Sequence, residues 1–139
     1  MSAFKDLNSH LEATTIKNSH SVKESATHKM ETRPLVSVVC LCYNQQDFVI
    51  EAIQSVIHQT YSPIEIIVVD DASSDNSARI INEFCSVHPS IRFLDLKINV
   101  GNCKAFNQAL MLANGKFIID LAADDILLPE RVEEGVNLL

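Results

Sequence analysis

The chain has 139 residues, of which 47% are hydrophobic and 21% are charged, a composition typical of one globular domain and unlike that of a disordered segment. Its net charge of −7 arises in residues 34–139, which hold six basic and fourteen acidic side chains and so lack the basic surface of a nucleic-acid-binding protein. No apolar run approaches the roughly 20 residues that cross a bilayer, and the first residues lack the apolar core of a secretory signal. We therefore expect a cytoplasmic protein with no nucleic-acid partner and no membrane segment in this chain.

Residues 1–33 differ in composition from the rest of the chain. They are rich in Ser, Thr, Asn, Lys and His, and they contain neither Gly nor Pro. A weak helical pattern occurs around Phe4, Leu7 and Leu11. We expect this segment to be a leader or linker to the domain and to be partly disordered.

From Pro34 onward, apolar runs alternate with segments of helical periodicity. The run Val36 to Cys42 is β-branched and almost continuously apolar, which is typical of a strand buried on both faces. The remaining predicted strands are 64–69, 91–96 and 117–121, and the predicted helices are about 46–58, 76–87, 103–113 and from Pro129 onward. Asn114 and Gly115 are typical of a helix C-cap. The order predicts an α/β fold, an open and mostly parallel twisted sheet with helices on both faces.

Three polar clusters follow predicted strands, at the sheet edge where ligands bind in such folds. They are Tyr43 with Asn44, Asp70 with Asp71, and Asp124 with Asp125. Tyr43 and Asn44 open the turn after the first strand. Asp70 and Asp71 begin a predicted turn, where one of them could accept hydrogen bonds from a nucleotide. The alternative is a helix-capping turn in which Asp75 caps the helix that follows.

The acid pair Asp124 and Asp125 follows the last predicted strand directly. Adjacent carboxylates are costly neighbours unless a cation or hydrogen-bond donors hold them. They could bind a divalent metal ion that carries a phosphate. The alternative is that they are turn residues that favour the N-terminal end of the helix at Pro129.

The four cysteines show no metal-binding spacing. Cys40, Cys42, Cys85 and Cys103 form no C-x-x-C motif, and no histidine is spaced with them as a zinc site requires. Cys40 and Cys42 lie two residues apart on a predicted strand and should point to one face of the sheet. We interpret all four as reduced thiols in the core.

Five sequence blocks occur together, in one order and with a particular spacing. They read PLVSVVCLCYN, AIQSVIHQTY, IEIIVVDDASSDNS, NVGNCKAFNQAL and ANGKFIIDLAADDILLPER. This combination resembles the family 2 glycosyltransferases of the GT-A fold. The resemblance covers about residues 34–139, which it implies are the N-terminal, nucleotide-sugar-binding half of such an enzyme, shortened at the C-terminus.

The resemblance implies an inverting, hexosyltransferase-like enzyme that uses a nucleoside-diphosphate sugar, usually UDP-linked, with Mn²⁺ or Mg²⁺. By position, Leu41 to Asn44, including Tyr43, would line the nucleotide site, Asp71 would contact the uracil, and Asp70 would support the turn. Asp125 would bind the metal, and Asp124 would bind the ribose or share the metal. The implied role is polysaccharide or glycoconjugate synthesis with a saccharide or lipid-linked acceptor, in the cytoplasm or at the membrane periphery in the full-length protein.

Two positions depart from the pattern of the family. Ala122 stands where many members have a further Asp, and Phe106 stands where many have Arg before the Asn matched by Asn107. Inverting transfer also needs a carboxylate base, which the family carries well downstream of the acid pair. We therefore assign no catalytic residue and expect the base downstream of Leu139, so that this piece alone would be inactive.

Two other functions remain as alternatives. A non-catalytic nucleotide-binding domain on a transferase scaffold would share every motif described above. A phospho-receiver domain in signalling also gathers acids at strand ends, but it would need its acidic pair after the first strand, where this chain has Tyr43 and Asn44. Labelling of an Asp by acetyl phosphate would favour the receiver.

Overall fold

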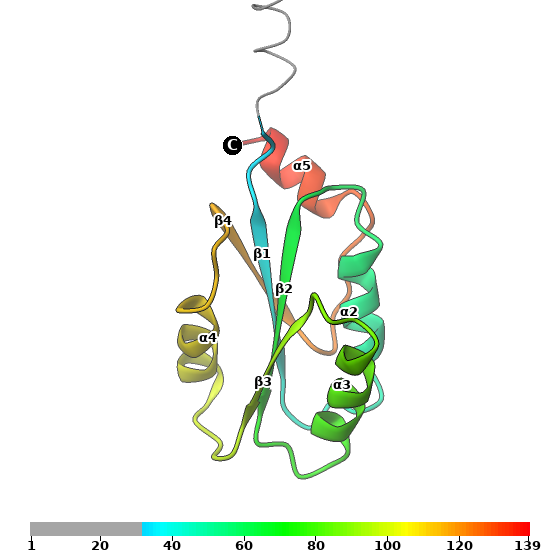
Figure 1. The fold of residues 1–139 in the computed structure, drawn as a ribbon, viewed down its shortest axis with the longest axis vertical. Helices are drawn as coiled ribbons and strands as arrows, with labels where there is room; N and C mark the ends of the chain where they lie inside the picture. The colour runs from blue at the N-terminus through cyan, green and yellow to red at the C-terminus, as the bar shows by residue number, and fades with distance from the viewer. Residues whose placement is uncertain (1–31) are drawn as a thin grey trace, which may run out of the picture. The chain divides into compact units, whose positions relative to one another are not determined.

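The computed structural model describes residues 32–139 (Figure 1). Most of the predicted leader, including the weak helical pattern around Phe4, Leu7 and Leu11, lies outside these residues. Strands and helices alternate in the predicted order. They are β1 Val36–Cys42, α2 Val49–Ile57, β2 Ile64–Asp71, α3 Ser77–Ser86, β3 Arg92–Leu96, α4 Asn102–Leu110, β4 Phe117–Ala122 and α5 Arg131–Asn137.

The four strands form one parallel sheet in the order β3-β2-β1-β4. Val36 at the start of β1 pairs with Ile64 of β2 and with Phe117 of β4. The chain thus winds from β1 outward to β3 and then returns to the other side of β1. The predicted α/β fold with an open parallel sheet is confirmed, and the winding reverses between β1 and β4.

Helices cover both faces of the sheet, with α2 and α3 on one face and α4 on the other (Figure 1). Alternate residues of β1 face the two layers. Val38 and Cys40 pack in the cluster that includes Ile53 of α2 and Ile81 of α3. Val39 packs instead with the small residues Ala105 and Ala109 of α4. Burial on both faces explains why the β1 run is almost continuously apolar.

Two predicted turn features are wrong. Asp70 and Asp71 are the last residues of β2 rather than the start of a turn, because Asp70 still pairs with Cys42 and Asp95. Asn114 and Gly115 do not cap α4, which ends four residues earlier at Leu110. Their backbone amides bond to Glu65 and Ser37 of neighbouring strands instead.

The interpretation of the cysteines as core thiols holds for two of the four. Cys40 and Cys42 are buried on the same face of the sheet, and burial raises the pKa of Cys40 to about 12 and that of Cys42 to about 11. Cys85 is half-buried. Cys103 is exposed, so its interpretation as a core thiol is wrong: it lies in the first turn of α4 on a face that the sheet does not cover.

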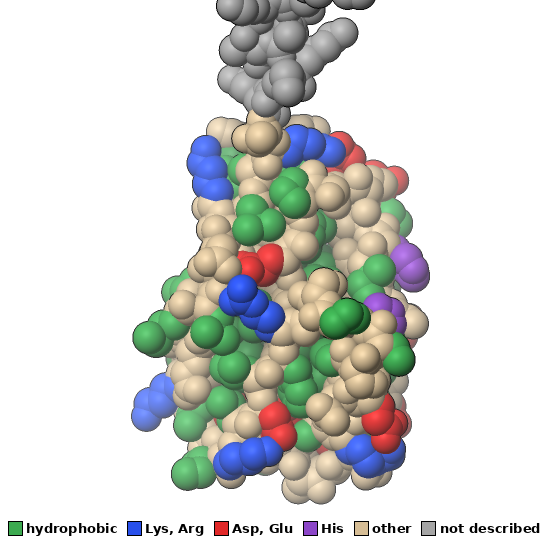
Figure 2. Space-filling model, viewed as in Figure 1, with side chains coloured by type: hydrophobic (Ala, Val, Ile, Leu, Met, Phe, Trp, Pro, Cys, Tyr) green, Lys and Arg blue, Asp and Glu red, His purple; other side chains and the backbone are tan. Residues whose placement is uncertain are grey.

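The described surface mixes charged and apolar side chains. On the face shown in Figure 2, Lys and Arg side chains are scattered singly among hydrophobic and acidic ones. Within residues 32–139, no helix is both long enough and apolar enough to cross a membrane.

Candidate functional site

An open cleft of about 730 Å³ lies at the carboxyl ends of β1 and β4, where the winding reverses. Three parts of the chain form its walls: the end of β1 with its following loop, the first two turns of α4, and β4 with its following loop. Among the residues predicted for the site, Leu41, Tyr43, Asp124 and Asp125 line the cleft, whereas Asn44, Asp70 and Asp71 do not. The other lining residues are Gln45, Asn102, Cys103, Phe106, Asn107, Asp120, Ala122 and Ala123.

The loop after β4 presents the acid pair to the cleft. The Ala123 backbone N–H donates to the carbonyl oxygen of Leu41 at 2.9 Å, and that of Asp125 donates to Ala122 at 3.0 Å. These bonds tie the start of the loop to the end of β1. Asp124 and Asp125 are exposed, and neither forms an ion pair with any residue in the described range. Both carboxylates are therefore open to a ligand.

The acid pair suits a hard divalent cation held partly by phosphate. In residues 32–139, no three His, Cys, Asp or Glu side chains come together as a metal site. Mg²⁺ commonly keeps several waters and binds through one or two carboxylates together with substrate phosphates. Asp124 and Asp125 could supply these carboxylates, and a bound metal would offset the charge of a diphosphate.

Tyr43 and Asn44 are neighbours in the loop after β1, but only Tyr43 lines the cleft. Tyr43 is 47% exposed and lines the cleft. Asn44 adopts a left-handed backbone with φ of 53°, which Asn tolerates better than most residues. Its Oδ1 accepts hydrogen bonds from the backbone N–H groups of Ser74 and Asp75 at 2.8 and 3.3 Å. Asn44 therefore joins the loop after β1 to the loop after β2.

The two acids at the end of β2 hold neighbouring loops. Asp70 is fully buried, and its carboxylate accepts hydrogen bonds from the Ser73 backbone N–H at 2.9 Å and hydroxyl at 2.6 Å. Asp71 is 4% exposed and accepts bonds from the backbone N–H groups of Val100 and Gly101, both at 2.8 Å. The predicted contact of Asp71 with a base stays a prediction.

Asp75 supports the start of α3, but from one residue before the N-cap position, which Asn76 occupies. Asp75 Oδ1 accepts a hydrogen bond from the Ser77 backbone N–H at 2.9 Å, at the start of α3. Its Oδ2 accepts another from the Gln46 backbone N–H at 3.2 Å. Desolvation raises the pKa of Asp75, but hydrogen bonding with the Ser77 side chain and with the Ser77 and Gln46 backbone N–H groups outweighs it and lowers the pKa overall.

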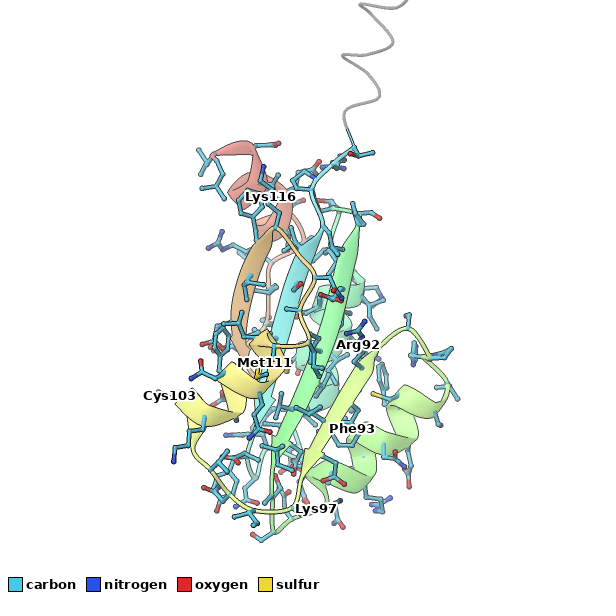
Figure 3. All side chains as sticks on the ribbon, turned by 60° about the vertical axis from the view of Figure 1, so that its left-hand side comes forward. Arg92, Phe93, Lys97, Cys103, Met111 and Lys116 are labelled. Atoms are coloured by element: carbon cyan, nitrogen blue, oxygen red, sulfur yellow. The ribbon has the colours of Figure 1, made fainter. Side chains whose placement is uncertain are left out.

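Most of the α4 wall was not predicted as part of the site. Asn102, Cys103, Phe106 and Asn107 line the cleft, and Figure 3 shows Cys103 at the beginning of α4. These positions are one, three or four residues apart, the spacing of one helix face. The spacing indicates that the four residues share one helix face. It does not show that this face lies opposite β4, which depends on the order of the strands in the sheet.

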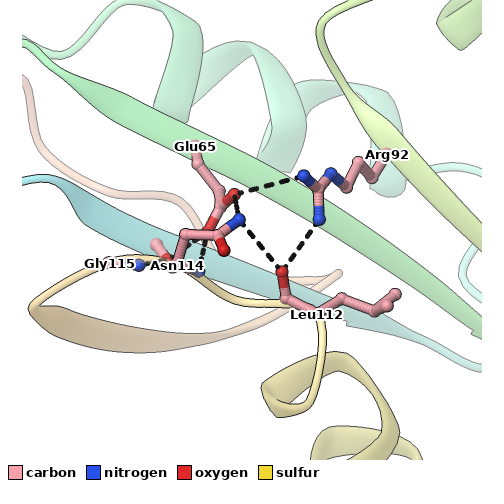
Figure 4. Close-up of polar contacts among 6 residues, drawn as sticks. Glu65, Arg92, Leu112, Asn114 and Gly115 are labelled. Carbon is pink, nitrogen blue, oxygen red and sulfur yellow. Dashed lines mark hydrogen bonds and ion pairs between the residues drawn. The ribbon is translucent and has the colours of Figure 1, made fainter.

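A polar cluster at the opposite ends of the strands sets the position of β4 (Figure 4). Glu65 accepts hydrogen bonds from the Ser37 hydroxyl at 2.5 Å and from the Asn114 backbone N–H at 2.6 Å. The Ser37 hydroxyl oxygen accepts another from the Gly115 backbone N–H at 2.8 Å. Arg92 lies 4.0 Å from Glu65 and donates to the carbonyl oxygen of Leu112. The cluster thus fixes the loop that leads into β4 and its acid pair.

Comparison with known protein families identifies the chain. The family model described as glycosyl transferase family 2 matches residues 37–139. The chain belongs to this family. This agrees with the resemblance of the five sequence blocks, and the sheet described above corresponds to the N-terminal half of a GT-A fold.

Relatives and solved structures agree with the family assignment. The chain is 38% identical over 110 residues to a chondroitin synthase from Escherichia coli, covering 79% of this chain and 16% of that protein. A mannosyltransferase from Pyrobaculum calidifontis in complex with GDP-Man and Mn²⁺ matches with a TM-score of 0.68 and 26% identity, covering 78% of this chain and 32% of that one.

A further solved structure is similar in fold. TarS residues 1–349 from S. aureus, in complex with UDP, matches with a TM-score of 0.66 and 28% identity, covering 73% of this chain and 31% of that one. TarS has also been solved with UDP-GlcNAc. The chain thus spans about a third or less of each of these proteins.

Proposed function

We propose that this chain binds the nucleoside-diphosphate-sugar donor, and that the whole protein is an inverting glycosyltransferase of polysaccharide or glycoconjugate synthesis. The donor is UDP-linked, and Mn²⁺ or Mg²⁺ binds with it. The observation that carries the proposal is the position of Asp124 and Asp125. Both line the cleft at the winding reversal between β1 and β4, where ligands bind in open α/β sheets.

Charge explains why donor binding requires a cation. A diphosphate would approach three carboxylates in this cleft, those of Asp120, Asp124 and Asp125, in a domain whose net charge is −8. Like charges repel strongly at short range in a partly enclosed site. Asp124 and Asp125 would hold a divalent ion there, and its positive charge would offset the negative charge of the diphosphate leaving group.

The proposed residue roles combine the family resemblance with the positions of the residues around the cleft. Asp125 binds the metal, and Asp124 binds the ribose or shares the metal. Leu41 and Tyr43 line the nucleotide side. Asn44 and Asp70 support this side from behind through the loops that they hold, and Asp71 supports the start of α4. The acceptor is a saccharide or lipid-linked group that the rest of the protein recognises.

Calorimetric titration of this chain with UDP, with and without Mn²⁺, tests the proposal. Wild type should bind UDP more tightly with Mn²⁺. Asp125→Asn should lose most of the metal-dependent gain, a weakening of about 10- to 100-fold, because a charge-assisted ligand is removed. Asp47→Asn is the matched control, since Asp47 is an exposed acid at the same end of the sheet outside the cleft. The site assignment would be overturned if Mn²⁺ does not change the affinity of wild type for UDP, or if wild type does not bind UDP.

A non-catalytic nucleotide-binding domain differs from this proposal in the fate of the donor. An enzyme releases UDP from UDP-sugar when acceptor is present, whereas a binding domain leaves the donor intact. Release of UDP by the full-length protein, abolished in Asp125→Asn, would support the transferase.

A further inference from the structure

A third carboxylate, that of Asp120, lies deeper along the cleft than the acid pair. Asp120 is on β4 and pairs with Val39, while Ala122 two residues later pairs with Leu41. Residues two apart on a strand point to the same face and lie about 6 to 7 Å apart. Val39 belongs to the cluster packed under α4, so Asp120 is on the α4 side of the sheet.

Asp120 is exposed even though it lies on a face that carries a helix. Helix α4 packs mainly over β1 and β2, where Ala105 and Ala109 contact Val39 and Ile67. The corresponding stretch of β4 stays open toward the cleft. Among the described residues, Asp120 has neither an ion pair nor a hydrogen-bond partner. Its carboxylate is open on the cleft wall, where a ligand could donate a hydrogen bond to it.

Helix α4 supplies another wall of the same cleft. Phe106 offers an apolar ring, and Asn107 offers an amide with both donor and acceptor atoms. An ionised carboxylate only accepts hydrogen bonds, and it repels phosphate. The part of the donor that sits beside Asp120 should therefore carry hydroxyl or N–H donors rather than phosphate.

We propose that Asp120 is a further ligand-binding residue of the cleft, which accepts a hydrogen bond from a hydroxyl or N–H group of the nucleoside or sugar of the donor. This inference rests on the proposed function, because it takes the cleft as the donor site. Asp120 then contacts an uncharged part of the donor, whereas Asp125 would hold the metal at the diphosphate.

A simpler role for Asp120 makes the opposite prediction. In this alternative, Asp120 has no role in binding, and its charge on an edge strand only discourages pairing with other strands. In that case Asp120→Asn removes a charge that repels the diphosphate, and UDP binds equally well or more tightly. If Asp120 instead accepts a hydrogen bond from the donor, the same change weakens binding, because a charge-assisted bond becomes a neutral one.

Calorimetry with two probes, UDP and UDP-GlcNAc, each with and without Mn²⁺, tests the inference on Asp120→Asn, Asp125→Asn, Asp47→Asn and wild type. Asp120→Asn should weaken at least one probe by about 10-fold while the gain from Mn²⁺ stays at the wild-type ratio. A loss seen already with UDP assigns the contact to the nucleoside, and a loss confined to UDP-GlcNAc assigns it to the sugar. An unchanged melting temperature shows that the variant is folded.

Three outcomes overturn the inference. Unchanged or tighter binding of both probes by Asp120→Asn assigns Asp120 to the strand edge alone. Loss of the Mn²⁺ gain, as in Asp125→Asn, assigns it to the metal. If wild type binds neither probe, the proposed function fails and this inference fails with it, whereas a failure confined to Asp120→Asn leaves the proposed function intact.

Discussion

Gly115 shows how one residue limits the position of β4. Its backbone N–H donates to the Ser37 hydroxyl oxygen at 2.8 Å. A Cβ at this position would overlap with that hydroxyl and lie 2.5 Å from the Ser37 backbone nitrogen. Both neighbouring atoms belong to the central strand β1, so neither can move freely. The absence of a side chain therefore permits the close approach that the cluster around Glu65 requires.

We expect Gly115→Ala to lower the free energy of unfolding by about 1 to 3 kcal/mol, the usual cost of forcing extra volume into a packed site. Urea denaturation, monitored by circular dichroism, measures this change in the free energy of unfolding. Gly135→Ala is the matched control, because its Cβ would approach only the end of the flexible Arg131 side chain, at 3.3 Å. Within helix α5 that change should leave stability unchanged or raise it by up to about 1 kcal/mol. Equal effects of the two substitutions would contradict the packing argument.

At the scale of elements, the end of β2 determines where α4 begins. The Asp71 carboxylate accepts bonds from Val100 and Gly101, the two residues immediately before α4. Gly101 has φ of 85°, a conformation that favours glycine. Since α4 supplies a whole wall of the cleft, the carboxylate of Asp71 shapes the site from outside it.

Asp71→Asn should therefore destabilise the protein without any ligand. An amide places an NH₂ donor against one of the two backbone N–H groups, and we expect a loss of about 1.5 to 3 kcal/mol in the free energy of unfolding. Denaturation in urea, in the absence of nucleotide, measures this loss. Asp95→Asn removes an exposed ion pair with Lys97 and should cost at most about 1 kcal/mol. Wild-type stability in Asp71→Asn would show that the loop holds without this carboxylate.

Across the whole molecule, the sequence predicts the features that depend on local pattern. Apolar runs and helical periodicity are sufficient for the order of elements and for a parallel sheet. The role of Asn114 and Gly115 could not be predicted in this way, because their partners Glu65 and Ser37 lie 49 and 78 residues away. The same holds for Asp71, whose partners follow β3, and for Cys103, whose exposure depends on how α4 crosses the sheet.

The dependence of stability on pH is a further property of the whole domain. Burial raises the pKa of Glu65, but hydrogen bonds from Ser37 and Asn114, with the charge of Arg92, outweigh it and hold the pKa below its ordinary value of 4.5. A carboxyl whose pKa is lowered in the folded state stabilises the protein above its unfolded pKa, and this contribution is lost as the pH falls through the folded pKa. Protonation of Glu65 would weaken the join between β1, β2 and the loop entering β4.

We therefore expect the free energy of unfolding to fall as the pH is lowered from about 5 toward 3. Glu65→Gln should be less stable than wild type at about pH 7 and should lose less on acidification, because it has no charge to lose. Glu83→Gln is the control: Glu83 forms an exposed pair with Arg79, so its removal should preserve the wild-type slope. Urea denaturation at a series of pH values measures all three proteins. If the free energy of unfolding of Glu65→Gln falls with pH as steeply as that of wild type, the ionisation of Glu65 does not contribute to the loss of stability in acid.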